Sequence, residues 1–128
     1  QCFLQLMEES ERSKEVYSQF VIFVQMMNDT NSFIRTRGLL LIAANAKWDD
    51  DNKIDEIIDD YLKHIMDEKP ITSRQCIKAL PSMVKYKTDL AEIVLTALNS
   101  ANPGIYKSSM QPLVSGDIQA ALKQINSI

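Results

Sequence analysis

Apolar side chains recur along this chain at the spacing of a helical face. The clearest run comprises Ile54, Ile57, Ile58, Tyr61, Leu62, Ile65 and Met66. Positions i, i+3, i+4 and i+7 lie on one side of an α-helix, so this run predicts an amphipathic helix over 54–66. Similar runs over 16–27, 90–98 and 118–125 predict further amphipathic helices.

The pattern also repeats along the chain. The segments 29–42, 67–80 and 100–113 align with one another, and the apolar runs before them keep the same register: Phe20, Ile58 and Ala91; Phe23, Tyr61 and Val94; Val24, Leu62 and Leu95; Met27, Ile65 and Leu98. Self-similarity at this period is typical of stacked helix pairs, in which neighbouring units bury each other's apolar faces. We therefore expect one all-α domain over 1–128, with units near 16–48, 52–87 and 88–114 and capping helices over 2–8 and 117–127.

Proline placement predicts where the second helix of each unit begins. The expected starts are Ser32, Pro70 and Pro103. Proline suits the first helical turn, where no backbone N–H is needed. Pro81 and Pro112 then fall late in the second and third of these helices, where each should bend or end the helix. The last helix is expected to begin only after Gly116.

Each unit also carries a motif around its turn. A turn aspartate is followed by a β-branched residue and an arginine, then by a small residue and an apolar residue. The first unit has Asp29, Ile34, Arg35, Gly38 and Ile42; the second keeps Asp67, Cys76 and Leu80; the third keeps Ile105, Ser109 and Leu113. This motif resembles the HEAT-repeat family. Armadillo-type repeats are the near alternative, but they need a third short helix for which the spacing leaves little room.

The resemblance implies a right-handed superhelix, or α solenoid, of about three HEAT-like helix pairs with terminal caps. Second helices would line its concave face and first helices its convex face. It also implies close helix packing at Gly38, Cys76 and Ser109, and a partial ladder of buried contacts between aspartate and arginine.

Charge is sorted between the two sets of helices. The segments 33–48, 69–87 and 102–114 hold nine basic and no acidic residues, whereas 49–68 holds nine acidic residues. In the implied solenoid the concave groove is then basic and the convex face acidic. Thr36, Arg74 and Lys107 occupy the same repeat position and would form a ladder along the groove. A groove of one sign attracts partners of the other sign. The expected binding residues are Arg35, Arg37, Arg74, Lys78, Lys85 and Lys107.

These observations predict a non-enzymatic binding or scaffold module whose groove holds an acidic protein or peptide segment. The same arginines and lysines could instead contact nucleic-acid phosphates, as in a relative of the HEAT-like DNA alkylation repair proteins. A solvated helix face gives the same charge bias without any partner. The oligomeric state stays open.

Candidate catalytic residues are sparse. His64 is expected on a charged helix surface, and Cys76 in the core at the position equivalent to Gly38. Trp48 beside Asp49 weakly suggests a base-excision site, but the second aromatic residue of such a site is missing. The run 49–56 lacks the glycine and glutamate of a calcium loop. We therefore expect no enzymatic activity, no cofactor and no metal.

Composition narrows the class of protein. A chain of 128 residues that is 45% hydrophobic and 24% charged suits one soluble globular domain. Cys2 and Cys76 lie far apart, which indicates neither a disulfide framework nor a zinc site. No apolar run approaches the roughly 18 residues of a membrane span, and no leader-peptide pattern is present. We expect a cytoplasmic protein without a membrane partner.

Overall fold

The regular structure is entirely helical in the computed structural model, which describes residues 2–128. The α-helices are α1 (Phe3–Arg12), α2 (Phe20–Met27), α3 (Ser32–Ala44), α4 (Lys53–Leu62), α5 (Pro70–Tyr86), α6 (Ala91–Asn99) and α7 (Gln111–Asn126). The 3-10 turns are η1 (Val16–Gln19), η2 (Ala46–Trp48), η3 (Lys63–Met66), η4 (Thr88–Leu90) and η5 (Pro103–Ile105). The all-α prediction is confirmed.

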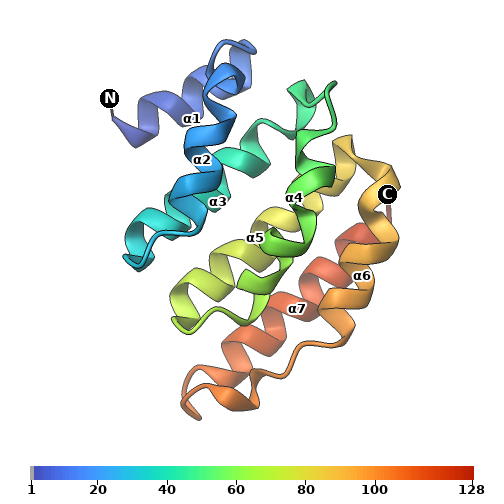
Figure 1. Cartoon of the computed structure of the whole chain (residues 1–128). Coiled ribbons are helices and arrows are strands. Elements are labelled where there is room, and N and C mark those ends of the chain that lie inside the picture. The colour runs from blue at the N-terminus through green and yellow to red at the C-terminus, as the bar shows by residue number, and fades with distance from the viewer. Residues whose placement is uncertain (1) are drawn as a thin grey trace.

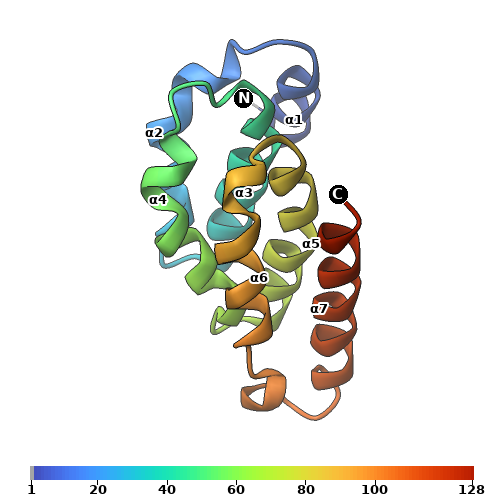
Figure 2. The same cartoon turned by 90° about the vertical axis from the view of Figure 1, so that its right-hand side faces the viewer.

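The helices form two rows. Figures 1 and 2 show α2, α4 and α6 following one another on one side of the molecule, with α3, α5 and α7 on the other. Within the second row α3 packs against α5, and α5 packs against α7. At one end, α1 packs against α3.

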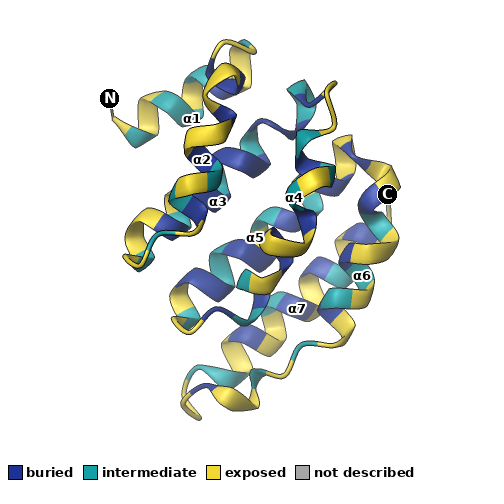
Figure 3. Ribbon diagram, viewed as in Figure 1, coloured by how far each residue is buried: buried dark blue, intermediate teal, exposed yellow. Residues whose placement is uncertain are grey.

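The apolar helix faces meet between the rows, where Figure 3 shows the buried residues concentrated. The helix predicted over 54–66 forms as α4 and continues as η3. Its residues Ile54, Ile58, Tyr61 and Ile65 are buried, as the periodicity predicts. The Tyr61 hydroxyl donates a hydrogen bond of 3.0 Å to the carbonyl oxygen of Leu39, so this polar group is satisfied inside the core.

Two of the three predicted second helices begin where expected. The side chain of Asn31 accepts hydrogen bonds from the first-turn amides of α3, and Pro70 opens α5. Pro81 does not end α5, which continues to Tyr86.

The predicted second helix of the third unit is wrong. Pro103 opens only the turn η5, and the helix begins at Gln111. It then runs through Gly116, so the expected cap over 117–127 is the later part of α7 rather than a separate element. The buried side chains Val114, Ile118, Ala121 and Ile125 share one helical face. Burial of that continuous face fixes α7 in a later register than the repeat motif suggested.

Close packing at the motif's small residues holds in two units. Gly38 and Cys76 are buried, whereas Ser109 is exposed in the turn before α7. A Cβ atom on Gly38 would lie 2.6 Å from the Met27 amide nitrogen and 2.8 Å from the Phe23 carbonyl oxygen. Only glycine therefore allows α2 and α3 to approach this closely.

We expect Gly38→Ala to lower the free energy of unfolding by about 1–3 kcal/mol, because the added methyl group meets backbone atoms that cannot move aside. Alanine normally stabilises a helix interior by about 1 kcal/mol over glycine, so a net loss would identify the clash. The control is Gly116→Ala in α7, where a Cβ atom meets nothing within 4 Å and stability should rise. Urea denaturation of both variants measures the difference.

Candidate functional site

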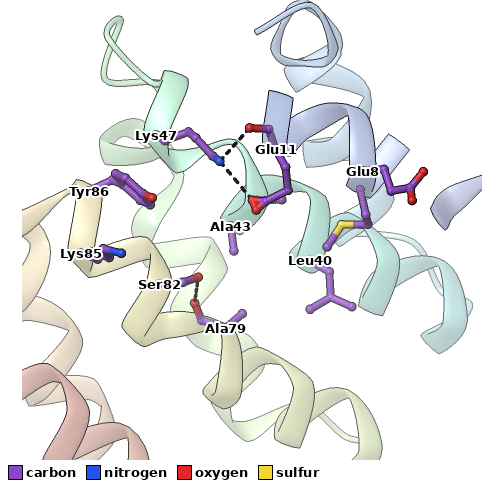
Figure 4. Close-up of a pocket in the computed structure, with 11 residues that line it drawn as sticks. Glu8, Glu11, Leu40, Ala43, Lys47, Ala79, Ser82, Lys85 and Tyr86 are labelled. Atoms are coloured by element: carbon purple, nitrogen blue, oxygen red, sulfur yellow. Dashed lines mark hydrogen bonds and ion pairs between the residues drawn. The ribbon is translucent and has the colours of Figure 1, made fainter. Parts of the chain in front are cut away.

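A groove of about 570 Å³ lies between α1, α3 and α5 (Figure 4). Its lining residues are Met7, Glu8, Glu11, Leu40, Ala43, Ala44, Lys47, Ala79, Ser82, Lys85 and Tyr86. We call it the α1–α3–α5 groove. Leu40, Ala43 and Ala44 share one face of α3, and Ala79 and Ser82 share one face of α5. These mostly small side chains leave room between helices that larger residues would fill.

The charges of the groove differ between its two walls. On the α1 wall, Glu11 pairs with Lys47, whose Nζ lies 3.0 Å from the Glu11 carboxylate and 3.1 Å from its carbonyl oxygen. On the α5 wall, Lys85 lies over the Tyr86 ring, with Nζ 5.5 Å from the ring centre. Within residues 2–128 Lys85 has no ion-pair partner, so its charge remains available to a ligand.

The six predicted binding residues do not gather in one place. Only Lys85 lines the groove, while Lys78 is exposed on the same face of α5, one turn from Ser82. Arg37 is exposed on α3, with its guanidinium 5.5 Å from the Phe3 ring. Lys107 lies in the turn before α7.

Two of the predicted binding residues are occupied by contacts within the fold. Arg35 is buried, which corrects its assignment to the binding surface. Arg74 donates from Nε to Asp117 on α7 at 2.6 Å. The expected ladder does not form either, because Thr36 bonds to Thr72 at 2.9 Å and Lys107 lies outside the helices. The sequence gives the charge of each side chain but not the partner that the fold brings to it.

Arg35 forms a buried ion pair with Asp67. Its Nε and Nη2 donate to the two carboxylate oxygens at 2.9 and 2.7 Å, and its Nη1 donates to the carbonyl oxygens of Asp29 and Thr30. Burial alone would raise the Asp67 pKa, but hydrogen bonds from Arg35 and His64 outweigh it and hold the pKa below its usual value. The pair joins α3 to the turn before α5.

His64 belongs to this cluster rather than to the surface where it was expected. Its Nδ1 lies 2.8 Å from a carboxylate oxygen of Asp67, and its side chain is only 13% exposed. On the other side of the turn, the Tyr106 hydroxyl donates to the Asp67 carbonyl oxygen. Asp67 therefore connects three segments that are distant in sequence.

A second buried cluster surrounds Asp49, and the sequence analysis missed it. Asp49 accepts hydrogen bonds from the Tyr17 hydroxyl and from the amides of Lys53 and Ile54, so it caps α4. The Lys87 Nζ lies 3.3 Å from the Asp49 carboxylate and 2.9 Å from that of Asp55. Burial would lower the Lys87 pKa, but the two carboxylates outweigh it and raise the pKa.

Both Trp48 and Asp49 make contacts within the fold. The Asp49 side chain has no exposed surface, and the Trp48 indole donates to the Ser10 carbonyl oxygen at 2.7 Å. A flipped base would need both groups to face an open pocket. The structure therefore does not arrange this pair as the base-excision site that the sequence weakly suggested.

We expect the two cysteines to differ sharply in reactivity. Cys76 is fully buried, which raises its pKa, and its Sγ lies 3.8 Å from the Tyr61 carbonyl oxygen. Cys2 is exposed, and backbone hydrogen bonds lower its pKa. Because the thiolate is the reactive form, alkylation of native protein should modify Cys2 quickly and Cys76 only on unfolding. Rapid labelling of Cys76, read by peptide mass spectrometry, would contradict the buried assignment.

Comparison of the chain with protein-family models, with curated proteins and with solved structures gives no match. Across residues 2–128 no helix has the length and apolar character needed to cross a membrane, and no three metal-ligating side chains gather at one point.

Proposed function

We propose that this chain is a HEAT-like α solenoid that acts as a non-enzymatic binding module. In this proposal the α1–α3–α5 groove holds a protein or peptide segment that carries acidic side chains. The observation that carries the proposal is an open groove with a floor of mostly small side chains. It is bordered by Lys85, which has no ion-pair partner in the described residues.

Support for the repeat architecture comes from the order and joining of the helices. From α2 to α7, successive helices lie alternately in the two rows (Figure 2). The Arg35–Asp67 pair links α3 to the turn before α5. The hydroxyl of Tyr106, directly after η5, donates to the Asp67 carbonyl oxygen in the same turn. Contacts of this kind between consecutive units are what a stacked array requires.

The charge distribution favours one orientation for the ligand. Glu8 and Glu11 border the groove on α1. Lys47 pairs with Glu11, so acidic side chains of a ligand would be repelled there by Glu8. Lys85 and Lys78 lie on α5, where acidic side chains would be attracted. The apolar floor of Leu40, with the neighbouring alanines, would contact the uncharged face of the ligand.

The test uses two labelled synthetic helical peptides, an acidic one of leucine and glutamate and a basic one of leucine and lysine. The acidic peptide should bind with a one-to-one stoichiometry in fluorescence anisotropy. Lys78→Glu combined with Lys85→Glu should weaken it by about tenfold or more, equivalent to about 1.4 kcal/mol. The matched control is Lys14→Glu combined with Lys63→Glu, two exposed lysines that do not line the groove, and it should bind normally.

Equal weakening by the groove variant and the control would show that net charge alone drives binding. A single-stranded oligonucleotide, tested at two salt concentrations, tests the nucleic-acid alternative. Saturable oligonucleotide binding that is lost in the groove variant, with no binding of the acidic peptide, would replace the proposal by the nucleic-acid alternative.

A further inference from the structure

A second apolar depression lies in the other row of helices, between α2 and α4. This cleft of about 460 Å³ is lined by Phe20, Val21, Val24, Asp51, Lys53, Glu56 and Ile57. We call it the α2–α4 cleft. The two helices are neighbours in both views of the molecule (Figures 1 and 2). It shares no lining residue with the α1–α3–α5 groove.

Helix α2 is apolar on its outward side as well as on its buried side. Val21 and Ile22 are 63% and 50% exposed, although the helix already buries Phe20, Phe23 and Met27 in the core. The range 20–27 contains no ionisable side chain. Exposed apolar side chains beside a cleft are typical of a contact surface for another molecule.

The α4 side of the cleft is acidic. Asp51 and Glu56 line it, and Asp60, one turn beyond Glu56 on the same helical face, pairs with Lys63 at 3.2 Å. Lys53 also lines the cleft, but its Nζ lies over the Tyr17 ring, 5.0 Å from the ring centre. One flank is thus apolar and uncharged, and the other carries net negative charge.

We infer that the α2–α4 cleft binds an amphipathic helix of a partner protein, with basic residues along one edge of its apolar face. Apolar side chains of that helix would cover Val21, Val24 and Ile57, and its lysine or arginine residues would meet Asp51 and Glu56. An apolar groove between two helices accommodates such a helix, and a complementary charged edge fixes its direction and register. The inference is independent of the proposed function, because it uses the other row of helices and a ligand of opposite charge.

The experiment uses the same basic peptide of leucine and lysine, with the acidic peptide as the charge control. Titration into isotopically labelled protein should shift the methyl resonances of Val21, Val24 and Ile57 in NMR spectra and saturate at one peptide per chain. Val21→Asp should weaken binding by about tenfold or more, because it places a charge on the apolar flank. Leu113→Asp, at an exposed apolar residue on α7, is the matched control and should leave the affinity unchanged.

A second pair of variants tests the acidic flank. Glu56→Lys should weaken binding and reduce its salt dependence, whereas Glu92→Lys, an exposed position on α6, should do neither. Equal effects of the two reversals, or shifts spread over all acidic surfaces, would overturn the inference. So would self-association of the protein that Val21→Asp abolishes, since the cleft would then serve a second copy of the chain.

Discussion

Arg35→Met is expected to lower the free energy of unfolding by about 3–5 kcal/mol. The substitution leaves the Asp67 carboxylate in a position where its side chain is only 4% exposed, without the guanidinium that contacts both of its oxygens. It also removes a donor from the carbonyl oxygens of Asp29 and Thr30. Urea denaturation at neutral pH measures the loss.

The control for this prediction is Lys63→Met, which removes the exposed Lys63–Asp60 pair and should cost no more than about 1 kcal/mol. Dependence on pH gives a second check. Because the folded-state pKa of Asp67 is lowered, its stabilisation is present above the unfolded value of about 4 and is lost as pH falls through the folded pKa. The difference between wild type and Arg35→Met should therefore shrink in acid. A difference that is constant with pH would mean that lost packing dominates.

Lys87→Met should have an effect of similar size, about 3–5 kcal/mol, for the same physical reason. The Asp49 side chain is fully buried and Asp55 is partly buried, and Lys87 is the cation that approaches both. Loss of that cation should also loosen the start of α4, because Asp49 caps this helix. Thermal and urea denaturation, with hydrogen exchange at the amides of Lys53 and Ile54, would measure both effects.

Lys85→Met provides a matched control two residues earlier in the chain. Lys85 is exposed and has no ion pair in the described structure, so the change should stay within about 0.5 kcal/mol. If Lys85→Met and Lys87→Met cost the same, the buried cluster around Asp49 would not contribute as described.

The helical class and most of the helices follow from the order of apolar and polar residues alone. The apolar residues of 54–66 needed only helical periodicity to predict α4 and η3, because one face must leave water whatever it packs against. Ser32 and Pro70 marked helix starts for an equally local reason, since the chemistry of a first turn depends on the residues within it. Gly38 and Cys76 were placed in the core from their position in the motif.

The register of the last helix and the availability of each charge depend on how the helices pack. Val114 continues the buried face of α7, which packs against α5. Burial of this face makes the helix begin later than Pro103, the start that the motif predicted, and leaves Ser109 before the helix. Arg35 and Arg74 looked equivalent to Lys78 and Lys85 in a count of charges, yet the first two meet aspartates distant in sequence. A side chain's charge is a property of its residue type, which the sequence states. Its partner depends on which segments the fold brings within a few ångströms, and only the packed helices fix that.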